Sequence, residues 1–539
     1  MLASWKPKYR STPSKEGIYL FVDVQLYDTT LRDGAQTEGI SFSVEDKIDV
    51  LKRLDAFGID FVEGGIPGSN PKDMEFFRRA SRITLEHTKL VAFGFTRRKD
   101  RTVQDDPMMK ALLESDTQWV CVVGKSSERH AKHVLSSTPG EYVKSVRETI
   151  EYLKSKERMV FFDAEHFFDG WKENKDFAES IVSTAVEAGA DCIVLCDTNG
   201  GCLPFEVSDI VKAVRRMTQI QLGVHMHNDA ETAVANSIAA VEVGVQLVQG
   251  TINGLGERCG NANLCSLIPA LSLKMKRRLS VQNLHDLTSL SKFVYEVANL
   301  VPDPRLPYVG SSAFAHKAGI HIDAVLKNPA AYEHVNPEEV GNVRHIVISE
   351  LTGISGILSK VKTLGVNNRE EAKSLLEQLK RMEFYGYQFE GAEASLDLLI
   401  RRLRNEMPSH FRLEGFRVLV DVSGGSTRSE AIVKVVDPRG EVEHTASDGN
   451  GPVNALDRAL RKALVRFFPE IQEMKLIDYK VRVIDTTSAT AAKVRVLIKS
   501  TDGSRTWATV GVSTNIIEAS LQALLDSIEY KLLERKGKS

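Results

Sequence analysis

The stretch VQLYDTTL, residues 24–31, is a short β-rich run that ends in polar residues, and similar runs recur along the first half of the chain. Segments with helical periodicity separate them, such as VEDKIDVLKRLDAFG (44–58). Eight strands that alternate with helices over this span predict a (β/α)8 TIM barrel better than an open sheet. The eight runs are VQLYDTTL (24–31), DFVEGG (60–65), LVAFGF (90–95), WVCVVGK (119–125), MVFFDAE (159–165), CIVLCDT (192–198), QLGVHMHN (221–228) and LVQGTIN (247–253).

Two further regions follow the predicted barrel. Residues 280 to about 410 show helical patterns broken by prolines, which predicts helical linker subdomains. From Phe416 strand-like runs and a helix alternate, and from Lys475 the pattern recurs, so we expect a small α+β domain with a duplicated β-β-α unit. The expected parts are an N-terminal extension (1–22), the catalytic barrel (23–279), the linker (280–412) and the C-terminal domain (413–539).

The composition is that of a soluble globular protein with a small-molecule partner. The chain has 539 residues, 42% of them hydrophobic and 26% charged, so it is too long for one compact domain. No apolar run approaches the roughly 20 residues that cross a bilayer. The formal net charge of -2 provides no basic field for nucleic acid or an anionic membrane.

Cysteine usage indicates a reducing compartment. The six cysteines form no C-x-x-C pair and lie mostly in apolar contexts, which favours free thiols and a cytoplasmic location. The basic, polar start of the chain lacks the apolar region of a secretory signal, so we interpret residues 1–22 as an extension. An organelle transit peptide is the alternative for this segment.

The seventh run carries the sharpest chemical signal. His225 and His227 are two apart on a strand, so both imidazoles project to the same side and can face one metal ion. Two histidines hydrogen-bonded near a strand end would give the same pattern. Asp33 favours the metal, because it follows the first strand, and the first and seventh strands open onto the same barrel mouth. Two imidazoles and a carboxylate predict a divalent metal site, with Mn, Zn or Mg as candidates.

Further polar residues stand where strands end. Arg32 could stabilise negative charge on a carbonyl oxygen, although a structural salt bridge is the simpler interpretation of a lone arginine. Thr198, at the end of the sixth run, suits a substrate carboxylate or a plain turn. Asn261, after the eighth run, could reach the metal or its water, because neighbouring glycines permit close backbone approach.

A candidate general base ends the fifth run. Glu165 could draw a proton from a methyl group, and its neighbours Asp163 and His166 could take the same role. Together with the residues above, it places polar groups at the ends of strands 1, 5, 6, 7 and 8. Scattered structural residues would seldom give that arrangement, so we expect an active site at the barrel mouth.

Three segments resemble the signatures of the 2-isopropylmalate, homocitrate and citramalate synthases, a branch of the metallolyase barrels: LYDTTLRDGAQ (26–36), GVHMHNDAETAVANS (223–237) and GTINGLGERCGN (250–261). The resemblance runs from about Val24 to the C-terminus. It implies a metal-dependent Claisen condensation of acetyl-CoA with a short 2-keto acid, followed by thioester hydrolysis. The implied roles are metal ligands for Asp33, His225, His227 and Asn261, keto-acid contacts for Arg32 and Thr198, and the catalytic carboxylate for Glu165.

Other segments refine this expectation. FAHKAGIHIDAVLKNPAAYEH (314–334) resembles the linker that covers the active site in the family, so His321 and Tyr332 match residues implicated in acetyl-CoA handling. That linker can reach a neighbouring subunit, which implies a homodimer. EGGIPGSNPKD (63–73) and TRRKDRTVQDDP (96–107) are similar to the citramalate branch, which makes pyruvate the expected acceptor.

The C-terminal domain resembles the regulatory domain of these synthases, where an end-product amino acid binds. Isoleucine is the expected effector if citramalate is made. Two loop-to-helix joints, GNGPVNAL (449–456) and VSTNIIEAS (512–520), would present backbone amides to a carboxylate. A dimerisation module without a ligand is the alternative.

Three rival functions remain at this stage. A 2-isopropylmalate synthase would take 2-oxoisovalerate as acceptor. A lyase of the 3-hydroxy-3-methylglutaryl-CoA type would use a catalytic cysteine in the loop that holds Cys259, which we interpret as a packing residue because its neighbours resemble the synthases. A barrel that keeps its metal only as a sensor would lack the base and acid-binding positions found here.

Overall fold

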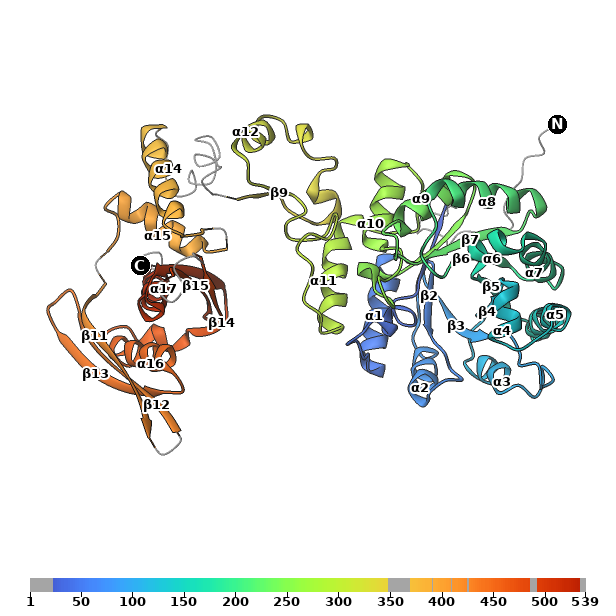
Figure 1. The fold of residues 1–539 in the computed structure, drawn as a ribbon, viewed down its shortest axis with the longest axis horizontal. Helices are drawn as coiled ribbons and strands as arrows, with labels where there is room; N and C mark the ends of the chain where they lie inside the picture. The colour runs from blue at the N-terminus through green and yellow to red at the C-terminus, as the bar shows by residue number, and fades with distance from the viewer. Residues whose placement is uncertain are drawn as a thin grey trace. The chain divides into compact units, whose positions relative to one another are not determined.

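The computed structural model describes residues 23–347, 369–389, 391–408, 410–423, 426–484 and 492–533. The chain forms two compact units (Figure 1). The barrel unit comprises Met1–Phe314 and His334–Arg344, and the C-terminal unit comprises Ala315–Glu333 and His345–Ser539. The predicted N-terminal extension, residues 1–22, lies outside the described residues.

The expected (β/α)8 barrel is confirmed. Eight strands close into a barrel in sequence order, and every neighbouring pair, including β1 with β8, is parallel. The polar ends of the predicted runs lie beyond the paired residues, so Thr29, Thr30 and Leu31 form a turn after β1. The strands are β1 (Gln25–Asp28), β2 (Phe61–Gly65), β3 (Lys89–Phe95), β4 (Trp119–Lys125), β5 (Met159–Glu165), β6 (Cys192–Asp197), β7 (Gln221–Met226) and β8 (Leu247–Gly250).

Helices follow each strand, as the amphipathic segments predict. Local signals set their ends: Ser43 and Asp46 form a capping box at the start of α1, and Gly58 ends that helix in the left-handed conformation. The helices are α1 (Val44–Phe57), α2 (Pro71–Ala80), α3 (Pro107–Glu114), α4 (Glu128–His133), α5 (Pro139–Ser155), α6 (Phe167–Glu173), α7 (Lys175–Glu187), α8 (Pro204–Met217), α9 (Ala233–Glu242), α10 (Leu264–Pro269) and α11 (Leu287–Val297).

The inside of the barrel is filled by an aromatic layer. Tyr27, Phe61, Trp119 and Phe161 are buried and pack in edge-to-face, tilted and stacked arrangements, with ring centroids 4.9 to 6.0 Å apart. A second core lies between the strands and the surrounding helices. The barrel is therefore packed rather than hollow, and polar side chains gather above the aromatic layer, at the carboxyl ends of the strands.

The segment after the barrel is less uniformly helical than its sequence pattern predicts. Two-residue strands β9 (Ala315–His316) and β10 (His345–Ile346) pair in parallel, and helix α12 (Gly319–Lys327) lies between them in sequence. Helices α14 (Arg369–Phe384) and α15 (Glu393–Leu403) then pack against the last sheet of the chain through Leu379, Ile400 and Val510.

The C-terminal domain is duplicated, with one correction to its predicted unit. Each repeat has three antiparallel strands and a helix, β-β-β-α, because the polar segment β13 also pairs. Its residues VEHTASDG alternate between exposed and half-buried positions and carry few large apolar side chains, so it gives no strand signal. The elements are β11 (Arg412–Ser423), β12 (Ser426–Val436), β13 (Val442–Gly449), α16 (Pro452–Val465), β14 (Lys475–Val483), β15 (Val494–Thr501), β16 (Thr506–Ser513) and α17 (Ile516–Leu532).

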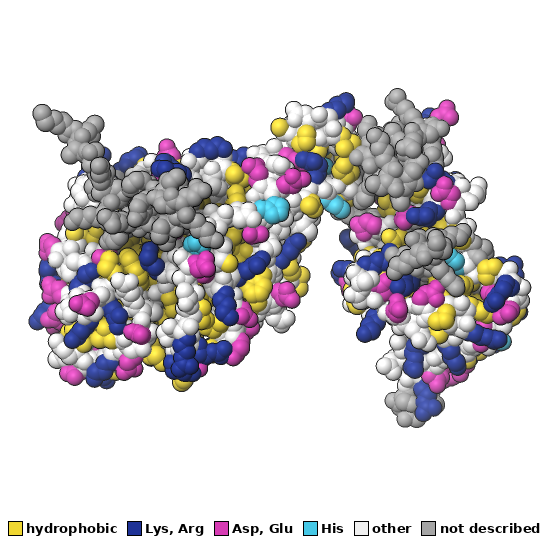
Figure 2. Space-filling view, turned by 180° about the vertical axis from the view of Figure 1, so that it is seen from behind, with side chains coloured by type: hydrophobic (Ala, Val, Ile, Leu, Met, Phe, Trp, Pro, Cys, Tyr) yellow, Lys and Arg dark blue, Asp and Glu magenta, His cyan; other side chains and the backbone are white. Residues whose placement is uncertain are grey.

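The surface carries mixed charge. Figure 2 shows Lys and Arg side chains interspersed with Asp and Glu over the visible face of each unit. Among the described helices, none combines the length and apolar character needed to cross a bilayer. All six cysteines lie in the described part of the chain and are free.

Candidate metal centre and active site

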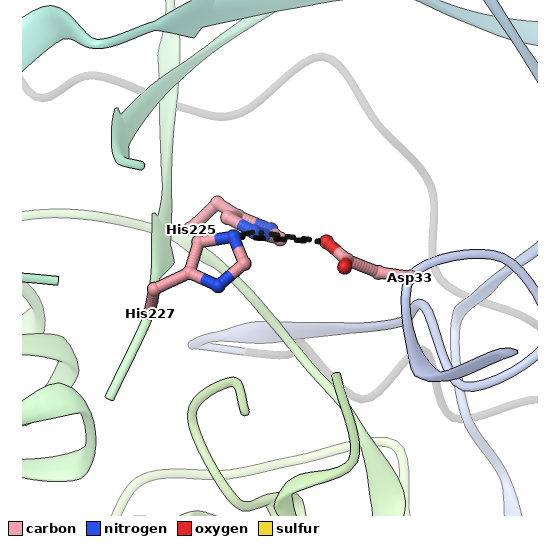
Figure 3. A group of neighbouring side chains, drawn as sticks. All are labelled: Asp33, His225 and His227. Carbon is pink, nitrogen blue, oxygen red and sulfur yellow. Dashed lines mark hydrogen bonds and ion pairs between the residues drawn. The ribbon is translucent and has the colours of Figure 1, made fainter. Parts of the chain in front are cut away.

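The structure brings together the three residues expected to bind a metal. Figure 3 shows the rings of His225 and His227, from the end of β7, facing the carboxylate of Asp33, from the turn after β1. Nε2 of His225 lies 3.3 Å from Nε2 of His227 and 3.3 Å from Oδ2 of Asp33. All three side chains are buried, and their ligand atoms lie within 4.8 Å of one another. Within the described residues, no other group of three such side chains converges in this way.

The turn after β1 is held by β8 and its loop. The amide of Thr29 donates to the carbonyl of Gly250 at 2.8 Å, which continues the β1–β8 pairing into the turn. The hydroxyl of Thr30 donates to Asp28 at 2.8 Å and accepts from the amide of Ile252 at 2.9 Å. These hydrogen bonds hold the segment that carries Asp33 against the end of β8 and the loop that follows it.

The charges of the three side chains are strongly coupled. Burial alone would raise the pKa of Asp33, but the guanidinium of Arg32 and a hydrogen bond from His225 hold that pKa far below its ordinary value. Burial opposes the charged form of His225, yet the bond to Asp33 raises its pKa. Burial and the neighbouring His225 lower the pKa of His227 to about 4. The carboxylate of Asp33 thus faces the neutral imidazole of His227 and the imidazole of His225, which takes up a proton more easily. Such a site suits a cation.

Arg32 is fixed on three sides. Its Nε donates to Glu63, its NH1 lies 3.2 Å from Asp33, and its guanidinium carbon lies 4.1 Å from the centre of the Phe93 ring. Burial opposes its charge, but Glu63 and Asp33 raise the pKa of Arg32 above its ordinary value. Arg32 therefore forms the salt bridges of a structural arginine and also holds a permanent positive charge beside the metal ligands.

Asn261 stands next to His227 and has a spare acceptor. The two residues form an isolated antiparallel bridge, and Nδ2 of Asn261 donates to the carbonyl of Leu255 at 3.0 Å. Its Oδ1 is buried and has no hydrogen-bond partner among the described residues. The glycine loop permits this approach, because a Cβ at Gly256 would lie 2.2 Å from Nδ2 of Asn261.

Glu165 lies at the end of β5, at the barrel mouth. Its Oε2 forms an ion pair with Lys125 from the end of β4, and its Oε1 lies 3.9 Å from Nε2 of His166. Asp163, two residues earlier, is buried below the mouth and accepts from Gln249 at 3.2 Å. Of the three candidate bases, Asp163 is thus the least accessible to a substrate.

Thr198 is more than a turn residue. Its Oγ1 accepts from the backbone amide of His166 at 2.8 Å, which holds His166 in a left-handed conformation with φ 57°. Its carbonyl accepts from Arg258 at 2.7 Å, and Arg258 pairs with Asp229 after β7. The loops after β5, β6, β7 and β8 are therefore linked around the mouth.

Buried polar atoms without a hydrogen-bond partner in the described residues gather at this mouth. Such atoms are costly unless a ligand, water or ion satisfies them, so their clustering indicates a binding site. They are Oγ of Ser126, Nδ1 of His130, Nδ1 of His166, Oδ1 of Asp197, Nδ1 of His227 and Oδ1 of Asn261.

Three further residues belong to the other unit or differ from expectation. Cys259 is exposed, so its interpretation as a packing residue is wrong. His321 and Tyr332 belong to the C-terminal unit, where their rings contact each other in a tilted arrangement with centroids 4.3 Å apart. The structure thus pairs His321 with Tyr332, but in the other unit from the metal ligands.

Two residues of the site were missed by the sequence reasoning. Glu63 is fully buried in the middle of β2, where it accepts from Arg32 and from the hydroxyl of Tyr27, the latter at 2.6 Å. Gln249 is fully buried on β8 beside His225. A charged or amide side chain within an apolar strand run was the available signal for both, because such groups are seldom buried without a specific partner.

Three protein families match the chain in order. The HMGL-like family matches residues 23–294, the homocitrate synthase post-HMGL domain-like family matches residues 308–385, and the LeuA allosteric (dimerisation) domain family matches residues 390–532. The matches cover the barrel, the segment after it and the duplicated C-terminal domain.

Relatives match nearly the whole chain. The (R)-citramalate synthase of Aquifex aeolicus (strain VF5) is 51% identical over 518 residues, covering 95% of this chain and 98% of that protein. The (R)-citramalate synthase of Geobacter sulfurreducens is 50% identical and covers 94% and 97%. A probable 2-isopropylmalate synthase of Methanopyrus kandleri is 32% identical and covers 95% and 99%. Sequence identity is therefore higher to these two citramalate synthases than to this isopropylmalate relative.

The site analysis predicts that Asp33→Asn weakens metal binding while the fold stays intact. The substitution removes the only carboxylate of the converging group but leaves the packed layers of the barrel untouched. We expect bound divalent metal, measured by atomic emission after dialysis, to fall well below one ion per chain, with an unchanged circular dichroism spectrum. Asp209→Asn, an exposed position on α8, is the matched control. Full metal content in the Asp33 variant would remove the assignment.

Proposed function

Because the chain belongs to the (R)-citramalate synthase family, we propose that its barrel joins acetyl-CoA to pyruvate and hydrolyses the thioester, giving citramalate and CoA. The observation that carries this proposal is the convergence of Asp33, His225 and His227 beside the fixed guanidinium of Arg32. Such a site can bind a 2-keto acid and stabilise the negative charge that develops on its carbonyl oxygen.

The residues present fit a divalent ion. Two imidazole nitrogens and a carboxylate oxygen lie close enough to share one ion, and the free Oδ1 of Asn261 is available beside them. When bound, the ion supplies Lewis acidity that polarises the keto-acid carbonyl. The donor set suits Zn and Mn, and a hydrated Mg ion is the third candidate.

Arg32 would act on the electrophile. Its guanidinium keeps its proton and is prevented from turning by Glu63 and Phe93, so it can offer a fixed donor to the developing alkoxide. Thr198, whose hydroxyl proton is not used in its bond to the His166 amide, would hold the substrate carboxylate. These two residues lie at the ends of β1 and β6, on the same mouth.

Glu165 would act on the nucleophile. Lys125 holds its Oε2 and leaves Oε1 available to take a proton from the acetyl methyl group, after which the carbon attacks the keto-acid carbonyl. Water then cleaves the thioester, which makes the condensation effectively irreversible. His166, 3.9 Å from Oε1, is the neighbour through which that proton could leave.

His321 and Tyr332 would complete the site for acetyl-CoA. Their rings are in contact, and both residues lie in the segment that matches the homocitrate synthase post-HMGL domain-like family. We propose that this segment covers a barrel mouth, in the homodimer that we infer. Edge strands β11 and β14 support such a dimer, because each carries exposed apolar side chains: Phe416, Val420 and Val422 on β11, and Ile477, Val481 and Val483 on β14.

The C-terminal domain would sense an end-product amino acid, with isoleucine as our candidate and a role in isoleucine synthesis as the implied context. The LeuA allosteric (dimerisation) domain match and the duplicated unit support this proposal. The N-termini of the two helices differ. Asn515 caps α17, and Glu518 already places a carboxylate in the first turn of that helix. Gly451 precedes α16 and provides no side-chain cap. The cytoplasmic location stays a prediction from the cysteine usage.

The acceptor preference tests the proposed reaction. A pocket built for the methyl group of pyruvate should disfavour a branched keto acid by about 1 to 3 kcal/mol per extra methyl group, or roughly 10- to 200-fold in kcat/KM. Thiol release from acetyl-CoA should therefore be fastest with pyruvate, compared with 2-oxoisovalerate and 2-oxoglutarate. A higher kcat/KM with 2-oxoisovalerate would identify an isopropylmalate synthase, and cleavage of 3-hydroxy-3-methylglutaryl-CoA would identify a lyase.

Feedback inhibition is the prediction for the C-terminal domain. Isoleucine should weaken acetyl-CoA or pyruvate binding by about 5- to 150-fold, the range that corresponds to about 1 to 3 kcal/mol of coupling between sites. Initial rates would be titrated with isoleucine, leucine and valine for the full chain and for a chain ending near residue 410. We expect inhibition by isoleucine only, and only in the full chain. If no amino acid changes the full-length rate or binds by calorimetry, the domain has an assembly role instead.

A further inference from the structure

We propose that Gln249 is a positioning residue of the metal centre, whose side-chain amide fixes the proton of His225 on Nδ1 and leaves Nε2 available to the ion. Asp163 in turn fixes the orientation of that amide. The inference rests on the proposed function of the site as a metal centre. It gives a role to two buried polar residues, on β8 and β5, that contact neither the substrate nor the ion in the mechanism above.

Strand pairing places Gln249 beside His225. The two residues are register partners in the parallel pairing of β7 and β8. Oε1 of Gln249 lies 2.9 Å from Nδ1 of His225, and Nε2 of Gln249 lies 3.2 Å from Oδ1 of Asp163. Gln249 is fully buried and Asp163 is nearly so, and water therefore competes little for these bonds.

The carboxyl group of Asp163 determines which way the side-chain amide of Gln249 faces. The oxygen and nitrogen of a glutamine can exchange places, and only the hydrogen-bond network decides between the two orientations. The charged carboxylate of Asp163 can only accept a hydrogen bond, and its Oδ1 lies within bonding distance of the Gln249 amide. The NH2 group of Gln249 must then face Asp163, and its oxygen must face His225.

The proton on His225 follows from this orientation. Oε1 of Gln249 can only accept, so Nδ1 of His225 must carry a proton, in the metal-free and the metal-bound protein alike. A metal ion at Nε2 then takes the place that a second proton would otherwise hold. Hydrogen bonds of this kind orient metal-binding imidazoles and raise their basicity, and their loss typically weakens metal binding about 10- to 100-fold.

His227 provides the internal contrast. Its Nδ1 is buried and has no hydrogen-bond partner among the described residues, so no protein group of that region selects its tautomer. Within the described part of the chain, a second hydrogen bond therefore orients the imidazole of His225 but not that of His227. We therefore expect the metal affinity of the centre to depend on Gln249, although this residue does not contact the substrate.

The test measures metal affinity without substrates. Gln249→Met keeps the approximate length and volume of the side chain but removes the acceptor. Gln249→Glu keeps an acceptor facing Nδ1 and, by sharing one proton with the carboxyl of Asp163, keeps a hydrogen bond at its other oxygen. Gln221→Met is the control, because Gln221 lies on the same strand as His225 and its side-chain amide donates to Gln25, at 2.6 Å, and not to a histidine of the site. The zinc dissociation constant of each purified protein would be measured by competition with a fluorescent chelator.

We expect zinc to bind Gln249→Met about 10- to 100-fold more weakly than wild type, and Gln249→Glu and Gln221→Met about as tightly as wild type. Unchanged affinity in Gln249→Met would overturn the proposal while leaving the metal centre in place. Equal losses in the Met and Glu variants would show a packing role and overturn it as well. Absence of zinc binding by the wild-type protein would instead remove the metal centre, and this inference with it.

Discussion

The closure of β1 against β8 is the constraint on which the active site depends. Asp33 and the two histidines are far apart in the sequence, and β8 stands between their strands in the barrel. Pairing from Gln25 with Leu247 to Asp28 with Gly250 continues into the bond between Thr29 and Gly250. That continuation bends the chain so that Asp33 faces β7. A slip in this pairing would move the only carboxylate of the group away from the imidazoles.

The cost of burying charge explains the rest of the centre. Glu63 and Asp33 are buried at the mouth, above the aromatic layer, and the Arg32 side chain is only 11% exposed, so isolated charges there would be strongly destabilising. Each has a partner: Arg32 lies between the two carboxylates, and Tyr27 donates to Glu63. Asp33 also faces the two histidines, and a cation bound among these three side chains would hold them together. The same pairings that make the charges tolerable also hold the ligands and the guanidinium in fixed positions before a substrate arrives.

Much of the fold could be predicted from the sequence, because buried parallel strands appear as continuous apolar runs and all eight runs form barrel strands. The convergence of Asp33, His225 and His227 could be predicted for the same reason, since these residues interrupt or follow such runs. Gln249 and Glu63 were not, because one polar residue in an apolar run gives no indication of its partner. Strand β13 was missed because its pairing depends on tertiary contacts and not on its own apolar pattern. The roles of His321 and Tyr332 rest on family resemblance, and no spacing rule connects them to the barrel mouth.

The most direct test of this account is X-ray absorption spectroscopy of the zinc-loaded protein, which reports the atoms bound to the ion. The account predicts two imidazole nitrogens and oxygen ligands, from His225, His227 and Asp33, with one imidazole lost in His227→Ala. A sulfur ligand at about 2.3 Å would place the ion on a cysteine such as Cys259. That result, or a spectrum without imidazole scattering, would contradict a metal centre assembled by the closure of the barrel.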